Sequence, residues 1–289
     1  MIGRLAGGLV IALVAGVLTG LFGVGGGFLI TPMLSIVLGL PMPLAVGTGV
    51  LNILGTTTSN LYWRRKSNLA DYKLAAVLFG GNAMGAYLGA NVLERWRLAG
   101  DLTIRGSRVA AADLYTLIVY LLVLSLIFMW MAFETRRPTP ATPRIGLFAR
   151  LRLPPYARFE SLEGPALSIP LLSYFGLLLG FLTGLLGVGG GVLLLPALVY
   201  LVGMRTHAAI VTSSVMVWLT SLVAGVSHAS AGNVDLMLLL VLLLGGTIGA
   251  QVGLVLCNRL SGARLRQYFA YVVLGVVVMV AIRLAGILI

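Results

Sequence analysis

The chain contains the sequence GVGGG twice, at residues 23–27 and again at residues 187–191. When the second copy is shifted back by 164 positions, 13 of the 19 residues from 16 to 34 are identical, and the register continues without a gap to about residue 92. An internal duplication in an apolar chain is typical of secondary transporters, in which two related halves move around a site near the middle of the bilayer. The repeat therefore predicts two structurally related halves.

Composition places the chain in a membrane. Hydrophobic residues make up 59% of the chain, charged residues 10%, and the mean hydropathy is +1.05. So little polar surface is not enough to cover a soluble globule. The formal net charge is +12, but the basic residues cluster between apolar segments. That distribution indicates the positively charged inner loops of a membrane protein, with the lipid bilayer as its surroundings, and it argues against a nucleic-acid partner.

Apolar segments alternate with glycine, proline or charged residues, five segments in each half. They cover residues 5–22, 28–38, 43–62, 74–93, 114–133, 171–186, 192–202, 208–226, 236–257 and 268–289. The long segments approach the roughly 20 residues of a full crossing, whereas the 11-residue segments after each GVGGG rise only about 16 Å. We predict an all-α polytopic membrane protein built from two inverted repeats, with glycine-broken or re-entrant half-helices at the start of each repeat.

The expected organisation has three regions. Residues 1–133 form the first transmembrane repeat, residues 134–170 a basic, proline-rich cytoplasmic linker, and residues 171–289 the second transmembrane repeat. If each half crosses an odd number of times and the N-terminus lies outside, 14 of the 20 basic residues lie inside. The basic loop at residues 64–66 corresponds in the second copy to a loop without Lys or Arg, which favours inversion; the arginines of residues 94–113 are the exception.

The glycine runs are the first candidate for function. Consecutive glycines are unfavourable inside a helix, tolerate positive φ and leave backbone N–H groups unshielded. The helix that follows each run carries partial positive charge at its N-terminus, so the runs predict two anion-binding ends that need no basic side chain. The lack of an alternating strand pattern around either run argues against a nucleotide-binding loop. The predicted donors are the backbone N–H groups of Gly25, Gly26, Gly27, Gly189, Gly190 and Gly191.

Other repeated glycines, Gly16, Gly20, Gly85 and Gly89, are explained by close packing of helices through small residues.

A cluster of small polar residues occurs in the third apolar segment of each half. Neutral hydroxyl and amide donors suit an anion that must be bound and then released. The alternative is that such hydroxyls bond back to carbonyls one turn earlier in their own helix. Met216 stands where the first half has Asn52, so the halves cannot contribute equal donors. The predicted substrate-binding side chains are Thr48, Asn52, Thr212, Ser213 and Ser214.

The remaining ionisable residues suggest structural roles. Asp71 and Asp235 are equivalent and each opens a fourth segment, where a carboxylate caps a helix N-terminus. His228 lies near the end of a span, where a solvated loop position is the expectation. The single cysteine, Cys257, lacks the spacing of a metal site, so we expect no metal and no cofactor.

The two glycine segments, GLFGVGGGFLITP and GLLGVGGGVLLLP, resemble the signature of the sulfite exporter TauE/SafE family, whose members carry GxGGG followed by a proline in each of two repeats. The resemblance covers nearly the whole chain outside the linker. It implies a multi-pass carrier of the cell inner membrane that moves sulfite or small organosulfonates, such as sulfoacetate, outward.

Together these observations predict a secondary transporter that exports small sulfur-containing anions by alternating access. An anion channel, or a carrier for another small carboxylate or oxyanion, is the alternative. An intramembrane enzyme is disfavoured because no His, Asp or Glu lies in mid-span near Ser213 or Ser214 to serve as a base. The sequence leaves the oligomeric state open, a homodimer included.

Overall fold

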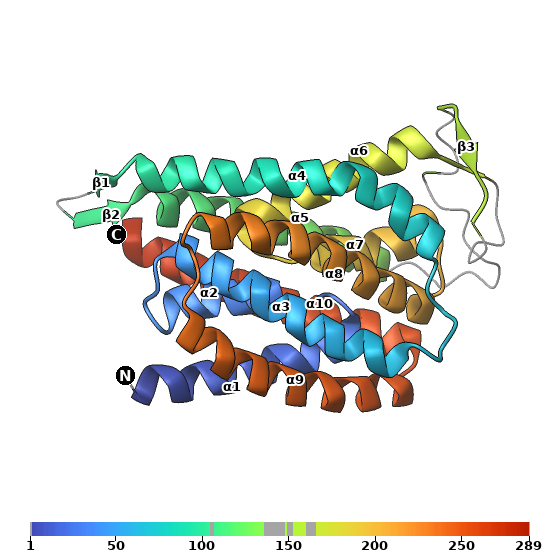
Figure 1. The fold of residues 1–289 in the computed structure, drawn as a ribbon, viewed down its shortest axis with the longest axis horizontal. Helices are drawn as coiled ribbons and strands as arrows, with labels where there is room; N and C mark the ends of the chain where they lie inside the picture. Colours follow the sequence, from blue (N-terminus) through green and yellow to red (C-terminus); the bar gives the residue numbers. More distant parts are fainter. Residues whose placement is uncertain (1, 105–106, 136–147, 149–152, 160–165, 289) are drawn as a thin grey trace.

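The computed structural model describes residues 2–104, 107–135, 148, 153–159 and 166–288, and the account below concerns these. Helices lie side by side in one bundle (Figure 1). Those of the first half are α1 (Ile2–Phe22), α2 (Gly27–Ile36), α3 (Met42–Arg64), α4 (Tyr72–Leu98) and α5 (Ala111–Thr135). Those of the second half are α6 (Ile169–Leu186), α7 (Gly191–Ala197), the π-helix η2 (Leu198–Val202), α8 (Thr206–Ser230), α9 (Leu236–Arg259) and α10 (Gly262–Leu288).

Seven helices in the described part of the chain are long and apolar enough to cross a membrane. They are α1, α4, α5, α6, α8, α9 and α10. Helix α3 has 23 residues but is not among them, because its threonines and asparagines lower its hydropathy. The prediction of a polytopic helical membrane protein is confirmed, and each predicted apolar segment corresponds to a helix or, for residues 192–202, to α7 with η2.

The closest helix packing joins the two halves. Helix α1 packs along α9, and α4 packs along α6, which are equivalent pairs under the shift of 164 residues. A methyl group on Gly16 would overlap the Gly246 carbonyl, and one on Gly85 would overlap the Leu177 carbonyl. Backbone contacts this close require small residues, so the expectation for Gly16, Gly20, Gly85 and Gly89 is confirmed.

Equivalent helices run in opposite directions in Figure 1. Helix α3 runs from the end of the bundle that carries both termini towards the end near β3 (Tyr156–Ala157), and α8 runs the other way. Both α4 and α9 begin with the expected cap: Asp71 Oδ1 accepts from the Leu74 N–H at 2.8 Å, and Asp235 Oδ1 from the Leu238 N–H at 3.0 Å. The capping prediction is therefore confirmed.

Short strands occur in the two longest connections. Strand β1 (Asp101–Ile104) pairs antiparallel with β2 (Ser107–Ala110) between α4 and α5, a hairpin that the sequence did not indicate. Strand β3 pairs with β4 (Leu167–Ser168) just before α6. Most of the predicted linker, residues 134–170, lies outside the described residues, so its boundaries stay a prediction.

Candidate functional site

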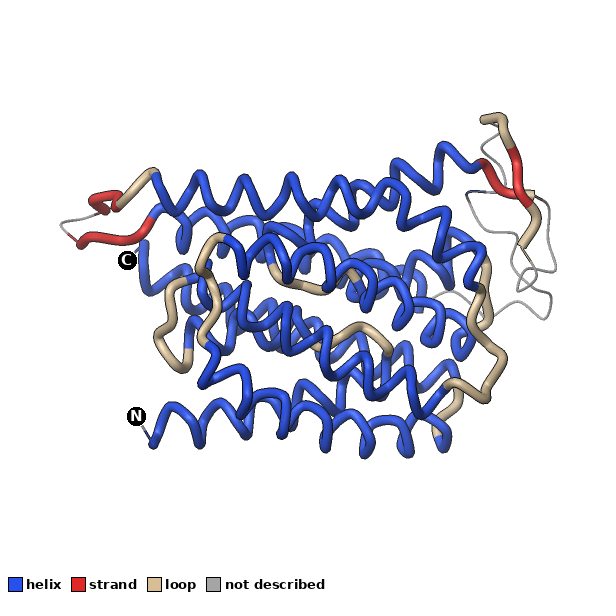
Figure 2. The backbone as a smooth tube through the Cα atoms, in the orientation of Figure 1, coloured by secondary structure: helices blue, strands red, loops and turns tan. Residues whose placement is uncertain are grey.

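Each glycine run connects two consecutive helices inside the bundle. Helix α1 ends at Phe22 and α2 begins at Gly27, while α6 ends at Leu186 and α7 begins at Gly191. In each run the same three positions have positive φ, a conformation that favours glycine: 65°, 77° and 66° in the first and 68°, 73° and 71° in the second. Figure 2 shows the two runs as short loops within the bundle.

The two runs contact each other. A methyl group placed on Gly27 would overlap the Gly187 carbonyl oxygen, and one placed on Gly191 would overlap the backbone of Val24. Each run therefore lies directly against the other, with no side chain between these backbone segments.

Carbonyl groups at this junction already have hydrogen-bond donors, each from the other half of the chain. Ser213 Oγ donates to the Gly23 carbonyl at 3.1 Å, and Thr31 Oγ1 donates to the Gly187 carbonyl at 3.3 Å. The buried Tyr120 hydroxyl donates to the Leu186 carbonyl at 2.8 Å. These bonds tie the halves together and occupy backbone acceptors at the junction.

Backbone N–H groups of the same runs are left over. Within the described part of the chain, no oxygen accepts from the N–H groups of residues 25–27 or 189–191. The first internal bonds of the following helices run to the Gly26 and Gly190 carbonyls, from donors two or more residues beyond each run. Because these N–H groups lie at the N-termini of α2 and α7, they give the junction partial positive charge without a charged side chain, which suits an anion.

Apolar side chains cover this junction. A methyl group on Gly25 would lie 2.5 Å from Ile53 Cγ2 and 2.7 Å from Val217 Cγ1. Ile53 on α3 and Val217 on α8 are equivalent under the 164-residue shift, and both are buried. The donors are therefore enclosed, so an anion reaches them only if these two side chains move.

Among the predicted side chains, Asn52 differs from the rest. It is fully buried, and neither its amide nitrogen nor its amide oxygen has a hydrogen-bond partner. A methyl group on Gly246 of α9 would lie 2.4 Å from Thr56 Cγ2 and 3.1 Å from Asn52 Oδ1, so both side chains lie beside that glycine. A buried amide without partners is costly and rare, so Asn52 keeps unused donor and acceptor capacity inside the bundle.

The predicted hydroxyls have partners within the protein. Thr48 Oγ1 accepts from the Asp235 N–H and Thr212 Oγ1 from the Asp71 N–H, both at 3.0 Å, at the starts of α9 and α4. Ser214 donates to the Ile210 carbonyl at 2.9 Å, and Ser213 shares its one hydroxyl proton between the Ile210 carbonyl at 2.9 Å and the Gly23 carbonyl. The structure thus brings Ser213 to the first glycine run, whereas Thr48 contacts the N-terminus of α9 and Thr212 contacts the N-terminus of α4.

Two threonines beside the glycines were missed. The Thr19 and Thr183 hydroxyls donate to carbonyls one turn earlier, at 3.0 and 2.9 Å. A methyl group on Gly26 or on Gly190 would lie 2.9 Å from the hydroxyl of the nearer threonine. Their repetition in Leu-Thr-Gly before both runs was an available signal. Tyr120 offered none, because Leu284 occupies the equivalent position in the second half.

At the ends of α3 and α8, two different residues make one equivalent bond. Arg64 Nη2 donates to the Gly20 carbonyl at 2.6 Å, and His228 Nε2 donates to the Gly184 carbonyl at 2.9 Å. His228 is only 1% exposed, so the expectation of a solvated loop histidine was wrong. The reason is that α8 extends past residue 226 and carries His228 against α6.

The bundle, its seven candidate spans and the enclosed polar junction define a multi-pass helical membrane protein. Residues 8–280 match the family described as sulfite exporter TauE/SafE. The chain belongs to this family, which is a family of membrane transporters.

Curated relatives agree with this assignment. The chain is 30% identical over 271 residues to the probable membrane transporter protein YjnA of Bacillus subtilis, covering 92% of this chain and 95% of the relative. It is 27% identical over 262 residues to the probable membrane transporter protein YunE of the same organism, covering 87% and 88%. A probable membrane transporter protein of Xylella fastidiosa is 25% identical over 278 residues, covering 95% and 92%. No solved structure gives a significant match.

Proposed function

We propose that this transporter exports sulfite or a small organosulfonate by alternating access, and that the anion binds where the two glycine runs meet. The observation that carries the proposal is the contact between the runs, in which Gly27 lies against Gly187 and Gly191 against Val24. Two helix N-termini then share one enclosed, donor-rich point. A sulfur oxyanion offers several oxygens, each able to accept from a backbone N–H group.

Asn52 is the side chain that we assign to the anion itself. Its unpartnered amide has the capacity to donate, and the anion would supply the missing acceptor. Thr48, Thr212, Ser213 and Ser214 belong to the same proposed site in a supporting role, because their hydrogen bonds hold the joints and carbonyls around it.

Neutral donors are consistent with transport rather than permanent binding. A buried arginine would hold the anion strongly and leave an unpaired charge after release, whereas backbone N–H groups and an amide carry no net charge. We further propose that the halves are inverted repeats in the cell inner membrane. The basic end near residues 64–66 would face the cytoplasm, and both termini the outside, in keeping with the directions of α3 and α8.

Binding to the purified protein tests the site. Sulfite and sulfoacetate are titrated against the wild-type protein, the Asn52→Leu variant and the Asn91→Leu variant, the last being an exposed asparagine of α4 as matched control. A hydrogen bond to a charged group contributes about 1.5–3 kcal/mol, so Asn52→Leu should bind roughly ten- to a hundredfold more weakly. Equal affinity in all three proteins would exclude Asn52 from the site.

Flux through reconstituted vesicles separates a carrier from a channel. We expect uptake of labelled sulfite to saturate and to be accelerated by unlabelled sulfite on the opposite side, because a carrier exchanges its substrate. Flux that rises linearly with concentration and shows no exchange would favour the anion channel.

A further inference from the structure

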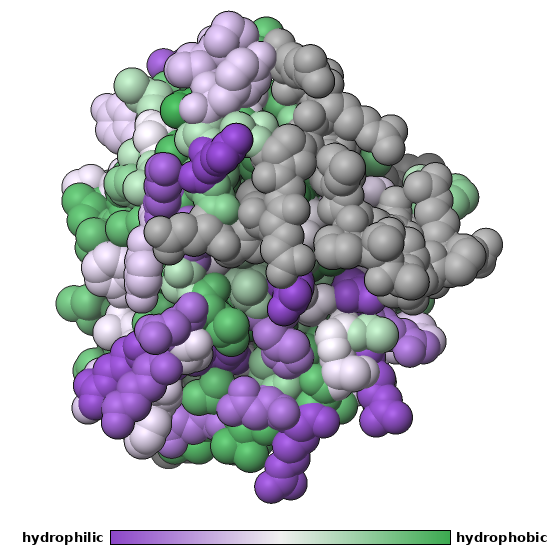
Figure 3. Space-filling model, turned by 90° about the vertical axis from the view of Figure 1, so that its right-hand side faces the viewer, coloured by the Kyte–Doolittle hydropathy of each residue, from purple (hydrophilic) through white to green (hydrophobic). Residues whose placement is uncertain are grey.

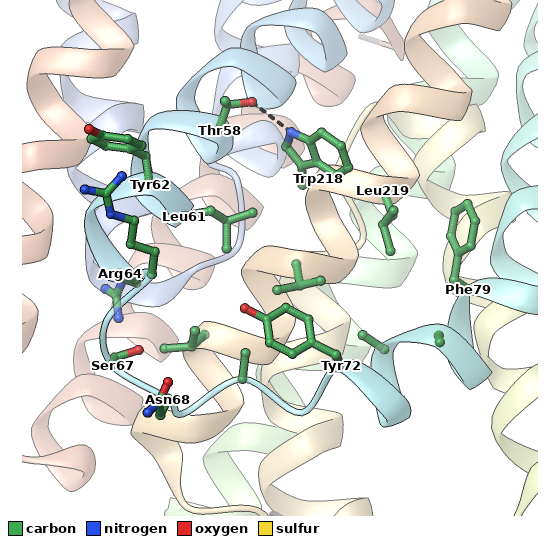
Figure 4. A pocket seen from close by; sticks show the side chains of 16 residues that line it. Thr58, Leu61, Tyr62, Arg64, Ser67, Asn68, Tyr72, Phe79, Trp218 and Leu219 are labelled. Carbon is green, nitrogen blue, oxygen red and sulfur yellow. Dashed lines mark hydrogen bonds between the residues drawn. The ribbon is translucent and has the colours of Figure 1, made fainter.

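A groove opens on the face formed by α3, α4 and α8, at the end of the bundle where α3 ends and α4 begins (Figure 4). Its volume is about 780 Å³, within the range of about 300–1,000 Å³ of small-molecule sites. The inner wall is apolar, with Phe79, Val215 and Leu219. The outer end, beside the α3–α4 connection, carries Arg65, Ser67 and Asn68.

Polar contacts mark both ends of this groove. At the inner end, Trp218 Nε1 donates to Thr58 Oγ1 at 2.8 Å, so both groups are satisfied without a ligand. At the C-terminal end of α3, the exposed Arg65 guanidinium lies 4.1 Å from the centre of the ring of Tyr62, another residue that lines the groove, in a cation–π contact. Figure 3 views this end of the molecule and shows hydrophilic side chains interspersed with apolar ones on its described surface.

The second half of the chain closes the equivalent face. Gly225 replaces Leu61, and a methyl group on it would lie 2.7 Å from Leu51 Cδ2. Gly55 corresponds to Leu219, and the Leu243 side chain occupies the space over it. Ala229 stands where the first half has Arg65. The groove is therefore built by residues particular to one end and does not follow from the repeat alone.

We propose that this groove binds one anionic phospholipid from the leaflet on the basic side of the membrane. Its acyl chain would lie along Phe79, Val215 and Leu219, and its phosphate would contact Arg65 with Ser67 and Asn68 as neutral donors. The argument is charge complementarity. The apolar wall of the groove lies along the membrane-spanning helices and would contact an acyl chain, and the Arg65 guanidinium lies where α3 ends and would contact the phosphate. This site is separate from the proposed anion site, and neither proposal depends on the other.

Native mass spectrometry of the detergent-solubilised protein tests the proposal. Phosphatidylglycerol and phosphatidylcholine with identical acyl chains are titrated, and the fraction of protein that retains one lipid is measured. We expect retention of phosphatidylglycerol at several-fold lower concentration than phosphatidylcholine. Arg65→Gln should weaken phosphatidylglycerol retention about fivefold, the effect of one basic residue near an anionic surface.

Two further variants keep the test sharp. Ala76 lines the groove and is exposed, so Ala76→Trp should fill the groove and remove retention of both lipids. Arg95→Gln changes an exposed arginine near the opposite end of α4 and should leave retention unchanged. Equal retention of the two lipids, unchanged retention in both Arg65→Gln and Ala76→Trp, or displacement of the lipid by millimolar inorganic phosphate would each overturn the proposal.

Discussion

At the scale of single residues, two buried asparagines illustrate what a polar group does inside this bundle. Asn82 on α4 accepts a hydrogen bond from the Thr220 hydroxyl at 2.7 Å, whereas the Asn52 amide has no partner. Both are almost completely buried. Asn82 therefore contributes to the fold, and Asn52 costs stability that a bound anion would restore.

Leucine substitutions separate these roles. Asn52→Leu should leave the melting temperature of the substrate-free protein unchanged or raise it, because an unsatisfied amide is replaced by an apolar side chain of similar size. Asn82→Leu should lower it by the net contribution of one buried hydrogen bond, about 0.5–1.5 kcal/mol, because the Thr220 hydroxyl keeps only the Met216 carbonyl as its acceptor. Thermal unfolding in one detergent measures both. A larger loss in Asn52→Leu than in Asn82→Leu would contradict the assignment.

Side-chain partners were the part of the site that the sequence predicted least. The pattern predicts Thr48 and Thr212 as ligands, which stays a prediction, and it did not indicate that their hydroxyls accept from N–H groups 187 and 141 residues away. Contacts across such separations depend on how the halves pack, which hydrophobic periodicity does not encode. The glycine positions were predictable because positive φ leaves few alternatives to glycine.

At the scale of elements, glycines on the contacting side of a helix allow its neighbour to approach closely. Gly80 and Gly81 are adjacent on α4 and face different surroundings. A methyl group on Gly81 would overlap the Ser173 carbonyl of α6, whereas one on Gly80 would have no atom within 4 Å. Helix α4 therefore packs on α6 along only one of its sides.

Alanine at these two positions gives a matched pair. Gly81→Ala should lower the melting temperature and the yield of folded protein, because α4 and α6 must separate to admit the methyl group. Gly80→Ala should be neutral or stabilising, since alanine is favoured over glycine in a helix by up to about 1 kcal/mol. Equal behaviour of the two variants in a detergent-solubilised melting experiment would contradict the packing described for α4.

Elements themselves were largely predictable from sequence. The apolar segments correspond to helices because membrane-buried backbone has to satisfy its hydrogen bonds internally. Helix α8 extends beyond the predicted apolar residues to Ser230, and its last turns carry His228, which packs against α6. The β1–β2 hairpin was missed because residues 101–110 show no regular alternation of apolar residues.

At the scale of the whole molecule, the direction of the helices yields a testable topology. Arg65 follows the end of α3, and Arg95 lies near the end of α4. Helix α4 has 27 residues and is therefore about 40 Å long, so it carries the chain from one end of the bundle to the other. The proposal of inverted repeats places these two residues on opposite sides of the membrane.

Cysteine labelling tests that placement. Arg65→Cys and Arg95→Cys are made with Cys257→Ala, which removes the buried native thiol. The cells are treated so that the reagent reaches the outer face of an intact inner membrane. A membrane-impermeant maleimide should then label Arg95→Cys at once and Arg65→Cys only after the inner membrane is permeabilised. Labelling of both before permeabilisation would refute the topology, and the reverse order would invert the orientation.

The most direct test of the central claim is an anomalous difference map from crystals grown with selenite, the heavier analogue of sulfite. The account predicts a selenium peak between the starts of α2 and α7. The selenite oxygens should lie about 3 Å from the backbone nitrogen atoms of Gly26, Gly27, Gly190 and Gly191. Ile53 and Val217 should be displaced from the positions they occupy without an anion. A selenium peak at another place, with the glycine junction still closed, would contradict it.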